Sequence, residues 1–62
     1  MKKYVTFYDL NRQLFVITQR EVKENQFGKI EILEGLINKD QVFDTKDDAI
    51  KSLRRSNYIE ID

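Results

Sequence analysis

The chain has 62 residues, enough for one domain that buries about 60% of its unfolded surface and keeps a stability margin of roughly 3 to 5 kcal/mol. Eleven basic and eleven acidic residues cancel, which excludes the global positive charge that small nucleic-acid-binding domains normally use to gather on phosphate backbones. The sequence has no Cys and no His, so disulfides, most zinc sites and the commonest catalytic side chains are excluded.

These exclusions predict a non-enzymatic protein without cofactor or metal. The carboxylates of Asp44, Asp47 and Asp48 match no calcium-loop spacing, and a helix start favours Asp for electrostatic reasons.

No apolar run approaches the roughly 20 residues of a membrane helix, and the first residues resemble no signal peptide, so we expect a soluble, cytoplasmic protein without membrane contact. Self-association is the remaining common way to stabilise so small a domain, and a homodimer stays open.

The first half of the chain predicts a hairpin of two long strands. Lys3 to Tyr8 alternates with a period of two, as expected for a central strand. Asp9 to Arg12 predicts a turn, because Asp and Asn readily bond their own backbone. The second strand is predicted from Leu14 to about Lys23, with its polar end projecting beyond the core. Asn25 to Gly28 supplies another reversal, with Gly28 at positive φ.

A third strand is predicted from Lys29 to Ile37, where alternation returns. Glu34-Gly35 interrupts it, and an isolated glycine in a strand commonly marks a bulge or a bend. Asn38 to Asp40 then turns the chain into a short edge strand from Gln41 to Phe43.

An amphipathic helix of about ten residues is predicted after this strand. Thr45 is the expected N-cap, with Asp48 reaching back in place of the Glu of a capping box, and Asp44 is the alternative cap. Ala49, Ile50 and Leu53 form a narrow apolar stripe that a sheet must cover, because so short a helix is marginal alone.

The chain returns to alternation at Tyr58 to Ile61, which predicts a last strand with Ile59 and Ile61 turned inward. The order is β-β-β-β-α-β. It predicts a single α+β domain over residues 1–62, with a small antiparallel sheet of three to five strands and one helix packed on one face.

One short segment resembles a known arrangement. Phe43-Asp44-Thr45-Lys46 followed by Ala49 is similar to the hairpin-to-helix junction of small ββ(β)α modules, including the amino-terminal arm-binding domains of phage-type integrases. The resemblance implies structural roles: Thr45 as the helix cap, and Phe43 and Ala49 as packing positions.

A protein-binding role needs the least special chemistry, because exposed tyrosines and a strand edge can anchor a partner. The candidate residues are Tyr4, Tyr8 and Tyr58. We therefore expect a small binding module that acts on a protein, including a second copy of itself, and the composition is compatible with an accessory protein of bacteria or their phages.

The alternative is a nucleic-acid-binding module with a basic and aromatic sheet face, since strand aromatics beside basic residues can stack nucleobases. Its candidate residues are Tyr4, Tyr8, Arg12, Arg20 and Lys23. Residues 1–30 carry a balance of +3 and residues 31–62 a balance of −3, so a fold that separates the two halves would create a basic face.

Overall fold

The structure is a computed structural model that describes residues 1–61. Its elements in chain order are β1 (Lys2–Asp9), β2 (Leu14–Glu21), β3 (Lys23–Glu24), β4 (Ile30–Ile32), β5 (Gly35–Ile37), the 3-10 helix η1 (Lys39–Gln41), β6 (Val42–Phe43), α1 (Lys46–Leu53) and β7 (Tyr58–Ile61). The predicted α+β class, with one helix on a sheet face, is confirmed. The strands form two sheets rather than one.

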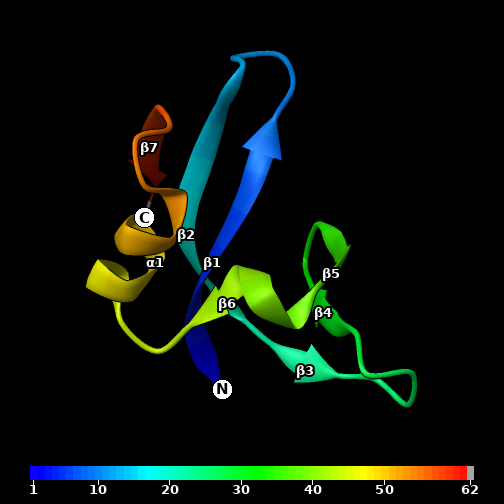
Figure 1. The fold of residues 1–62 in the computed structure, drawn as a ribbon. Helices are drawn as coiled ribbons and strands as arrows, with labels where there is room; N and C mark the ends of the chain where they lie inside the picture. The colour runs from blue at the N-terminus through cyan, green and yellow to red at the C-terminus, as the bar shows by residue number, and fades with distance from the viewer. Residues whose placement is uncertain (62) are drawn as a thin grey trace.

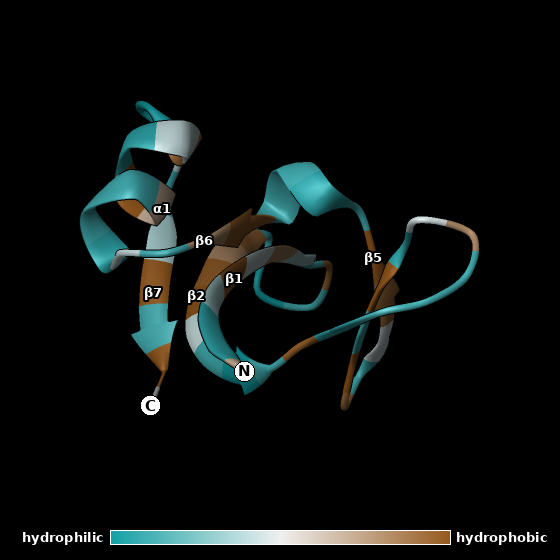
Figure 2. Cartoon of the chain, turned by 90° about the horizontal axis from the view of Figure 1, so that it is seen from below, coloured by the Kyte–Doolittle hydropathy of each residue, from teal (hydrophilic) through white to brown (hydrophobic). Residues whose placement is uncertain are grey.

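The three layers are α1, a four-stranded main sheet and a three-stranded small sheet. The main sheet has the order β6-β1-β2-β7, so the predicted central position of the first strand is confirmed, and the small sheet has the order β3-β4-β5. Figure 1 shows α1 on the left and the small sheet on the right, with the β1–β2 hairpin between them. In Figure 2 strands β5 and β6 and the first half of β2 are largely hydrophobic, whereas much of α1 is hydrophilic.

Two apolar clusters hold these layers together, one on each face of the main sheet. Under α1, the buried residues are Ile17, Ala49 and Leu53, and Phe43 and Ile50 pack against them. On the opposite face, the buried residues are Val5, Ile30 and Ile32, and the half-buried residues around them are Phe7, Val22, Ile37 and Val42. Both faces of β1 are therefore covered, which explains why it carries apolar residues on both sides.

The turn between β1 and β2 is held by the side chain of Asp9. Its carboxylate accepts from the backbone N–H groups of Asn11 at 2.9 Å and Arg12 at 3.2 Å. Gln13, at φ 57°, closes the loop by donating its N–H to the Asp9 carbonyl at 2.8 Å. The predicted turn is confirmed, and it sets the register that pairs Asp9 with Leu14 and Tyr8 with Phe15.

The predicted strand from Leu14 to Lys23 is divided between the two sheets. β2 ends at Glu21, Val22 separates the two strands, and β3 belongs to the small sheet. Val22 packs into the apolar cluster between the sheets, so the chain crosses from one layer to the other at this residue. The reversal at Asn25 to Gly28 is confirmed, with Gly28 at φ 77°.

The predicted single strand from Lys29 to Ile37 is wrong, because these residues form a hairpin. β4 and β5 pair in antiparallel orientation, with Ile32 opposite Gly35 and the turn at Leu33-Glu34. Gly35 has φ 134°, which a residue with a Cβ rarely adopts, so the interruption seen in the sequence marks a full reversal rather than a bend. The short edge strand before the helix is confirmed as β6.

The predicted helix and its cap are confirmed. The Thr45 hydroxyl accepts the N–H of Asp48 at 3.1 Å, whereas Asp44, the alternative cap, pairs with Lys3 of β1. Ala49 and Leu53 are buried and Ile50 is half-buried, as the stripe predicted.

The last strand pairs in an unexpected direction. β7 runs parallel to β2, so the main sheet is mixed rather than antiparallel, because the helical crossover returns the chain in the direction of β2. Ile59 is half-buried, but Ile61 is 40% exposed, which contradicts its predicted inward position. Ile61 is paired with Thr18 and so lies on the sheet face opposite α1, and it is not among the residues that pack between the main sheet and the small sheet.

Candidate functional site

Two of the three tyrosines predicted to bind a protein flank one phenylalanine on the main sheet. Tyr8 of β1 lies directly opposite Phe15 of β2, and Phe15 is paired with Tyr58 of β7. Residues directly opposite one another on paired strands share a face, so these three rings form a row across three strands, here called the aromatic row. It lies on the face that carries α1, because Ile17, two residues after Phe15, packs against the helix.

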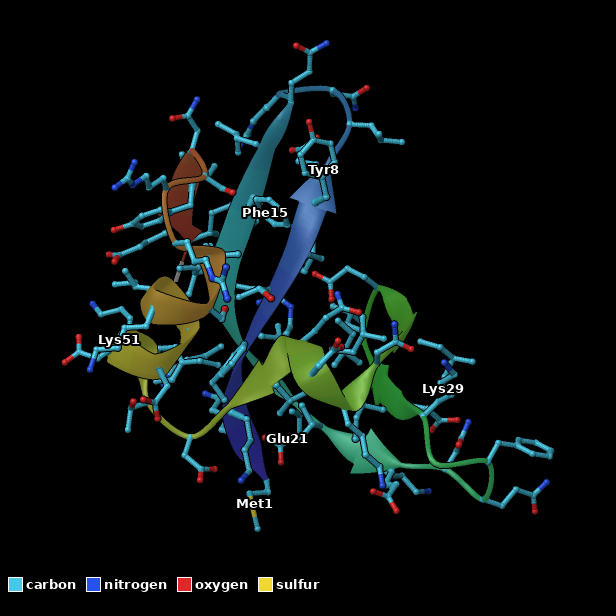
Figure 3. All side chains as sticks on the ribbon, in the orientation of Figure 1. Met1, Tyr8, Phe15, Glu21, Lys29 and Lys51 are labelled. Carbon is cyan, nitrogen blue, oxygen red and sulfur yellow. The ribbon has the colours of Figure 1, made fainter. Side chains whose placement is uncertain are left out.

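The rings of the aromatic row are exposed at its two ends and supported at its centre. Tyr8 is 48% exposed and Tyr58 38% exposed, whereas Phe15 packs against the buried cluster of Ile17, Ala49 and Leu53. The Tyr8 and Phe15 ring centroids lie 5.2 Å apart at an interplanar angle of 75°. Such an edge-to-face pair contributes about 0.5 to 1.5 kcal/mol beyond its buried area. Figure 3 shows both rings on the β1–β2 hairpin, above α1 in that view.

Tyr4, the third predicted tyrosine, has a different environment. It is half-buried and packs against the cluster beneath α1, so its ring serves mainly as core. It also lines a small hollow of about 50 Å³ near the start of the helix, together with Lys46 of α1 and Glu60 of β7. Only Tyr8 and Tyr58 therefore combine into an exposed surface.

The residues of the nucleic-acid-binding alternative are not gathered on one face. Arg12 lies in the hairpin turn, where its Nε is 3.8 Å from an Asp9 carboxylate oxygen. Arg20 points to the opposite face from Tyr4 and Tyr8, because it has the parity of Thr18 and contacts the small sheet. Lys23 belongs to β3 in that small sheet.

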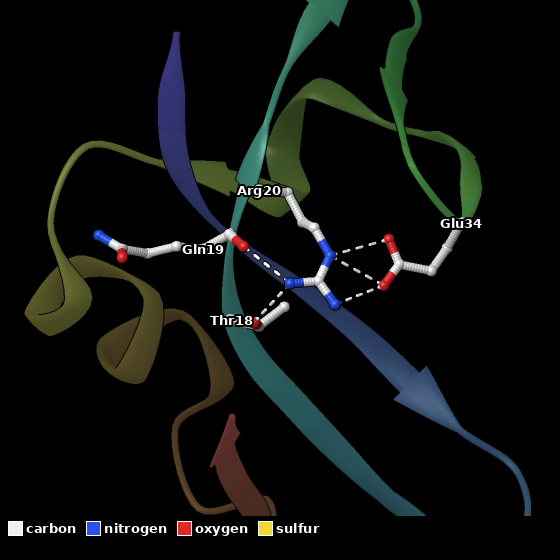
Figure 4. A network of polar contacts seen from close by, with 4 residues as sticks. All are labelled: Thr18, Gln19, Arg20 and Glu34. Atoms are coloured by element: carbon white, nitrogen blue, oxygen red, sulfur yellow. Dashed lines mark hydrogen bonds and ion pairs between the residues drawn. The ribbon is translucent and has the colours of Figure 1, made fainter. Parts of the chain in front are cut away.

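A polar network on this opposite face joins the two sheets (Figure 4). The Arg20 guanidinium donates to both carboxylate oxygens of Glu34, with its shortest contact 2.7 Å. Its Nη1 also donates to the buried Thr18 hydroxyl at 2.9 Å and to the Gln19 carbonyl at 2.8 Å. The hydrogen bonds from Arg20 lower the pKa of Glu34, and the same pairing raises the pKa of Arg20.

The two oppositely charged halves of the sequence interleave in space. Arg20 of the first half pairs with Glu34 of the second, and Lys3 pairs with Asp44. Glu24 and Lys39 form a third pair across the halves at 3.0 Å. Ion pairs of both senses therefore connect the two halves, which lie interleaved rather than apart.

An open hollow of about 350 Å³ lies at the rim of the small sheet, lined by Lys23, Glu24, Asn25, Gln26, Phe27 and Glu31. Phe27, at the tip of its loop, is 78% exposed.

Across residues 1–61, no group of three or more acidic side chains is arranged to hold a metal ion. The helices in this part of the chain are also too short to cross a membrane.

Comparisons with protein-family models, with curated proteins and with solved structures find no match for this chain. The site is thus argued from its own residues. Sequence reasoning predicted Tyr8 and Tyr58 but did not place Phe15 between them, because that placement requires the register of two strand pairings. The four-residue turn before β2 is the one local signal, and it determines how β1 pairs with β2 but not how β2 pairs with β7.

Proposed function

We propose that this chain is a small binding module that docks a protein partner through the aromatic row. The observation that supports this proposal is the combination of two exposed tyrosines with a central ring anchored in the core. Tyrosine is enriched at binding hot spots because its large ring is apolar while its hydroxyl can hydrogen-bond to a partner.

The support beneath the row favours binding in a second way. Tyr8 rests edge-on against Phe15, and Phe15 is held by residues of α1 and β2. A side chain that is already ordered loses less rotamer entropy when a partner binds, and each freely rotating side chain costs about 0.5 to 1.5 kcal/mol to immobilise. The row is thus preorganised for a partner that packs against it.

The geometry of the row favours a protein over a single-stranded nucleic acid. Consecutive bases stack on exposed ring faces beside a basic groove, but Tyr8 and Phe15 lie nearly perpendicular to each other. The cations of the alternative site are also dispersed, with Arg12 beside Asp9 and Arg20 held by Glu34. A partner with mixed apolar and polar side chains suits this surface better than a phosphate backbone.

The proposal is tested by affinity capture with the purified chain and lysate of its source organism, followed by identification and purification of the captured protein. Titration of that partner should show that Tyr8→Ala and Tyr58→Ala each lower the affinity by about tenfold or more, as expected for hot-spot residues. Leu33→Ala is the matched control, because Leu33 is apolar and 91% exposed but lies on the small sheet.

Two results would contradict the proposal. One is a captured protein that binds both tyrosine variants as tightly as the wild type. The other is tight, steeply salt-dependent binding of labelled single-stranded DNA or RNA that both tyrosine variants abolish, which would assign the row to a nucleic acid. Circular dichroism of each variant is the control, and it should give the same spectrum as the wild type.

A further inference from the structure

The outer edge of β7 is an open strand edge of the main sheet. β7 pairs with β2 on one side and, among residues 1–61, with no strand on its other side. Its sequence, Tyr58-Ile59-Glu60-Ile61, contains no Pro and no Lys, which are the residues that natural proteins place on edges to prevent further pairing. The other edge strands, β3, β5 and β6, are only two or three residues long.

The backbone groups on this edge follow from the pairing with β2. The Asn57 carbonyl accepts the N–H of Phe15 at 3.0 Å, so the backbone groups of Asn57 face β2. Backbone groups of a strand alternate between its two sides, so those of Ile59 face β2 as well, whereas the N–H and C=O groups of Tyr58 and Glu60 face away from the sheet. Two backbone donors and two backbone acceptors are thus available to hydrogen-bond with another strand.

We infer that β7 pairs in antiparallel orientation with β7 of a second copy of this chain, about a two-fold axis at Ile59. In that register, Tyr58 lies opposite Glu60 of the partner subunit, and the two residues whose backbone groups face outward exchange both of their hydrogen bonds. The same exchange occurs at the symmetry-related position. Every outward-facing backbone group of Tyr58 and Glu60 is then satisfied, and the main sheets of the two copies become one.

Repulsion between carboxylates favours this register over the one whose two-fold axis lies one residue further along the strand. A two-fold axis at Glu60 would place two carboxylates directly opposite each other, which is destabilising. The axis at Ile59 places the Glu60 carboxylate beside a tyrosine ring, and each Glu60 keeps Lys46 of its own chain 3.6 Å away.

The apolar side chains of β7 favour the same pairing. Ile59 and Ile61 share the sheet face opposite α1, with the parity of Val16 and Thr18, and there the small sheet does not cover them. In the proposed dimer, Ile59 faces Ile59 of the partner subunit, and Ile61 lies opposite Asn57 of the partner subunit and diagonally beside the Ile59 pair on the same face. The pairing would therefore cover part of Ile61, which is left 40% exposed in the single chain.

The inference does not depend on the proposed binding of another protein at the aromatic row. Adding a strand beside β7 extends the sheet in its own plane and leaves the ring of Tyr8 on β1 exposed, whereas Tyr58 lies at the proposed dimer contact and does not separate the two proposals. Tyr8→Ala should therefore leave self-association unchanged while weakening the capture of a partner, so that the failure of either proposal is recognised separately.

The test is the molar mass of the purified chain by sedimentation equilibrium over a wide range of concentration. The wild type should pass from the mass of one chain to that of two. Glu60→Pro should raise the dissociation constant by about tenfold or more, because proline removes an outward N–H from each copy without removing a bond to β2. Glu60→Ala is the matched control: it loses the Lys46 contact but retains the N–H, so it should still form dimers.

A strictly monomeric wild type at all concentrations would overturn the inference, and so would a dimer that Glu60→Pro leaves unchanged. Amide hydrogen exchange of the wild type gives a readout that needs no variant. Exchange at Tyr58 and Glu60 should slow as the protein concentration rises, and equal exchange rates in dilute and concentrated samples would also overturn it.

Discussion

Arg20 of β2 and Glu34 of the β4–β5 turn form a bidentate ion pair with a shortest contact of 2.7 Å, and this pair ties the small sheet to the main sheet. Arg20 is 25% exposed and Glu34 39% exposed, so solvent screens the pair in part. The guanidinium also satisfies the hydroxyl of Thr18, which is buried between the layers. The pair thus fixes the orientation of the Leu33-Glu34 turn, whose own sequence does not determine that orientation.

The first prediction is that the Glu34 carboxylate makes stability depend on pH. Its pKa is lowered in the folded chain by the hydrogen bonds from Arg20, so the stabilisation is fully present above the ordinary value of 4.5 and is lost as the pH falls through the lower folded value. Urea unfolding should show that Glu34→Gln is less stable than the wild type at neutral pH and that the two converge in acid.

Glu31→Gln is the control for this prediction, because Glu31 lies on the exposed face of the same sheet. It should keep the acid sensitivity of the wild type. A constant difference between Glu34→Gln and the wild type at every pH would show that the ion pair does not carry the effect.

The second prediction concerns the end of α1, where Arg54 adopts a conformation that suits glycine. Arg54 has φ 56° and ψ −113°, and the N–H of Ser56 donates to the Leu53 carbonyl at 3.0 Å, which together describe a type II′ turn. Arg54→Gly should raise the free energy of unfolding by about 1 kcal/mol, or roughly 4–8 °C in Tm, because the relieved strain exceeds the extra entropy of the unfolded chain. Arg55→Gly, at a residue without positive φ, should instead lower stability.

The third prediction tests the helix cap. Thr45→Ala removes the oxygen that accepts the Asp48 N–H and should lower the free energy of unfolding by about 1 kcal/mol. Thr45→Ser keeps the hydroxyl and should remain close to the wild type. Equal urea midpoints for all three chains would show that the cap contributes nothing measurable.

The fourth prediction compares two leucines in opposite environments. Leu53, on the buried face of α1, packs against the main sheet. Its replacement by alanine should lower the free energy of unfolding by about 2 to 5 kcal/mol, which is comparable with the entire stability expected of so small a domain. The Leu53→Ala chain should therefore be largely unfolded by circular dichroism. Leu33→Ala, at a side chain that is 91% exposed, should change stability by less than about 0.5 kcal/mol.

The sequence was sufficient where the determining contacts are local. The cap at Thr45, the apolar stripe of Ala49 and Leu53, and the turn closed by Asp9 all depend on residues within one helical turn or one loop. Each was predicted correctly because the interacting groups are close together in the chain. Gly28 was predicted at positive φ for the same reason.

The sequence was insufficient where distant contacts decide the structure. The Leu33-Glu34 turn contains no Asn, Asp or Pro, and its orientation is fixed by Arg20, which lies in another strand. The direction of β7 and the position of Phe15 between two tyrosines depend on pairings between strands that are far apart in the chain. Period-two alternation predicts a strand but not its neighbour, and the aromatic row therefore became visible only in the fold.

The parallel pairing of β2 with β7 has a consequence for the folding rate. The β1–β2 hairpin closes through a short turn, whereas joining Phe15 to Tyr58 closes a loop of most of the remaining chain, at a much larger entropic cost. We therefore expect β7 to dock after the folding transition state. Substitutions in this strand should then accelerate unfolding while leaving the refolding limb of the chevron nearly unchanged, so the lifetime of the folded chain is governed by its final strand.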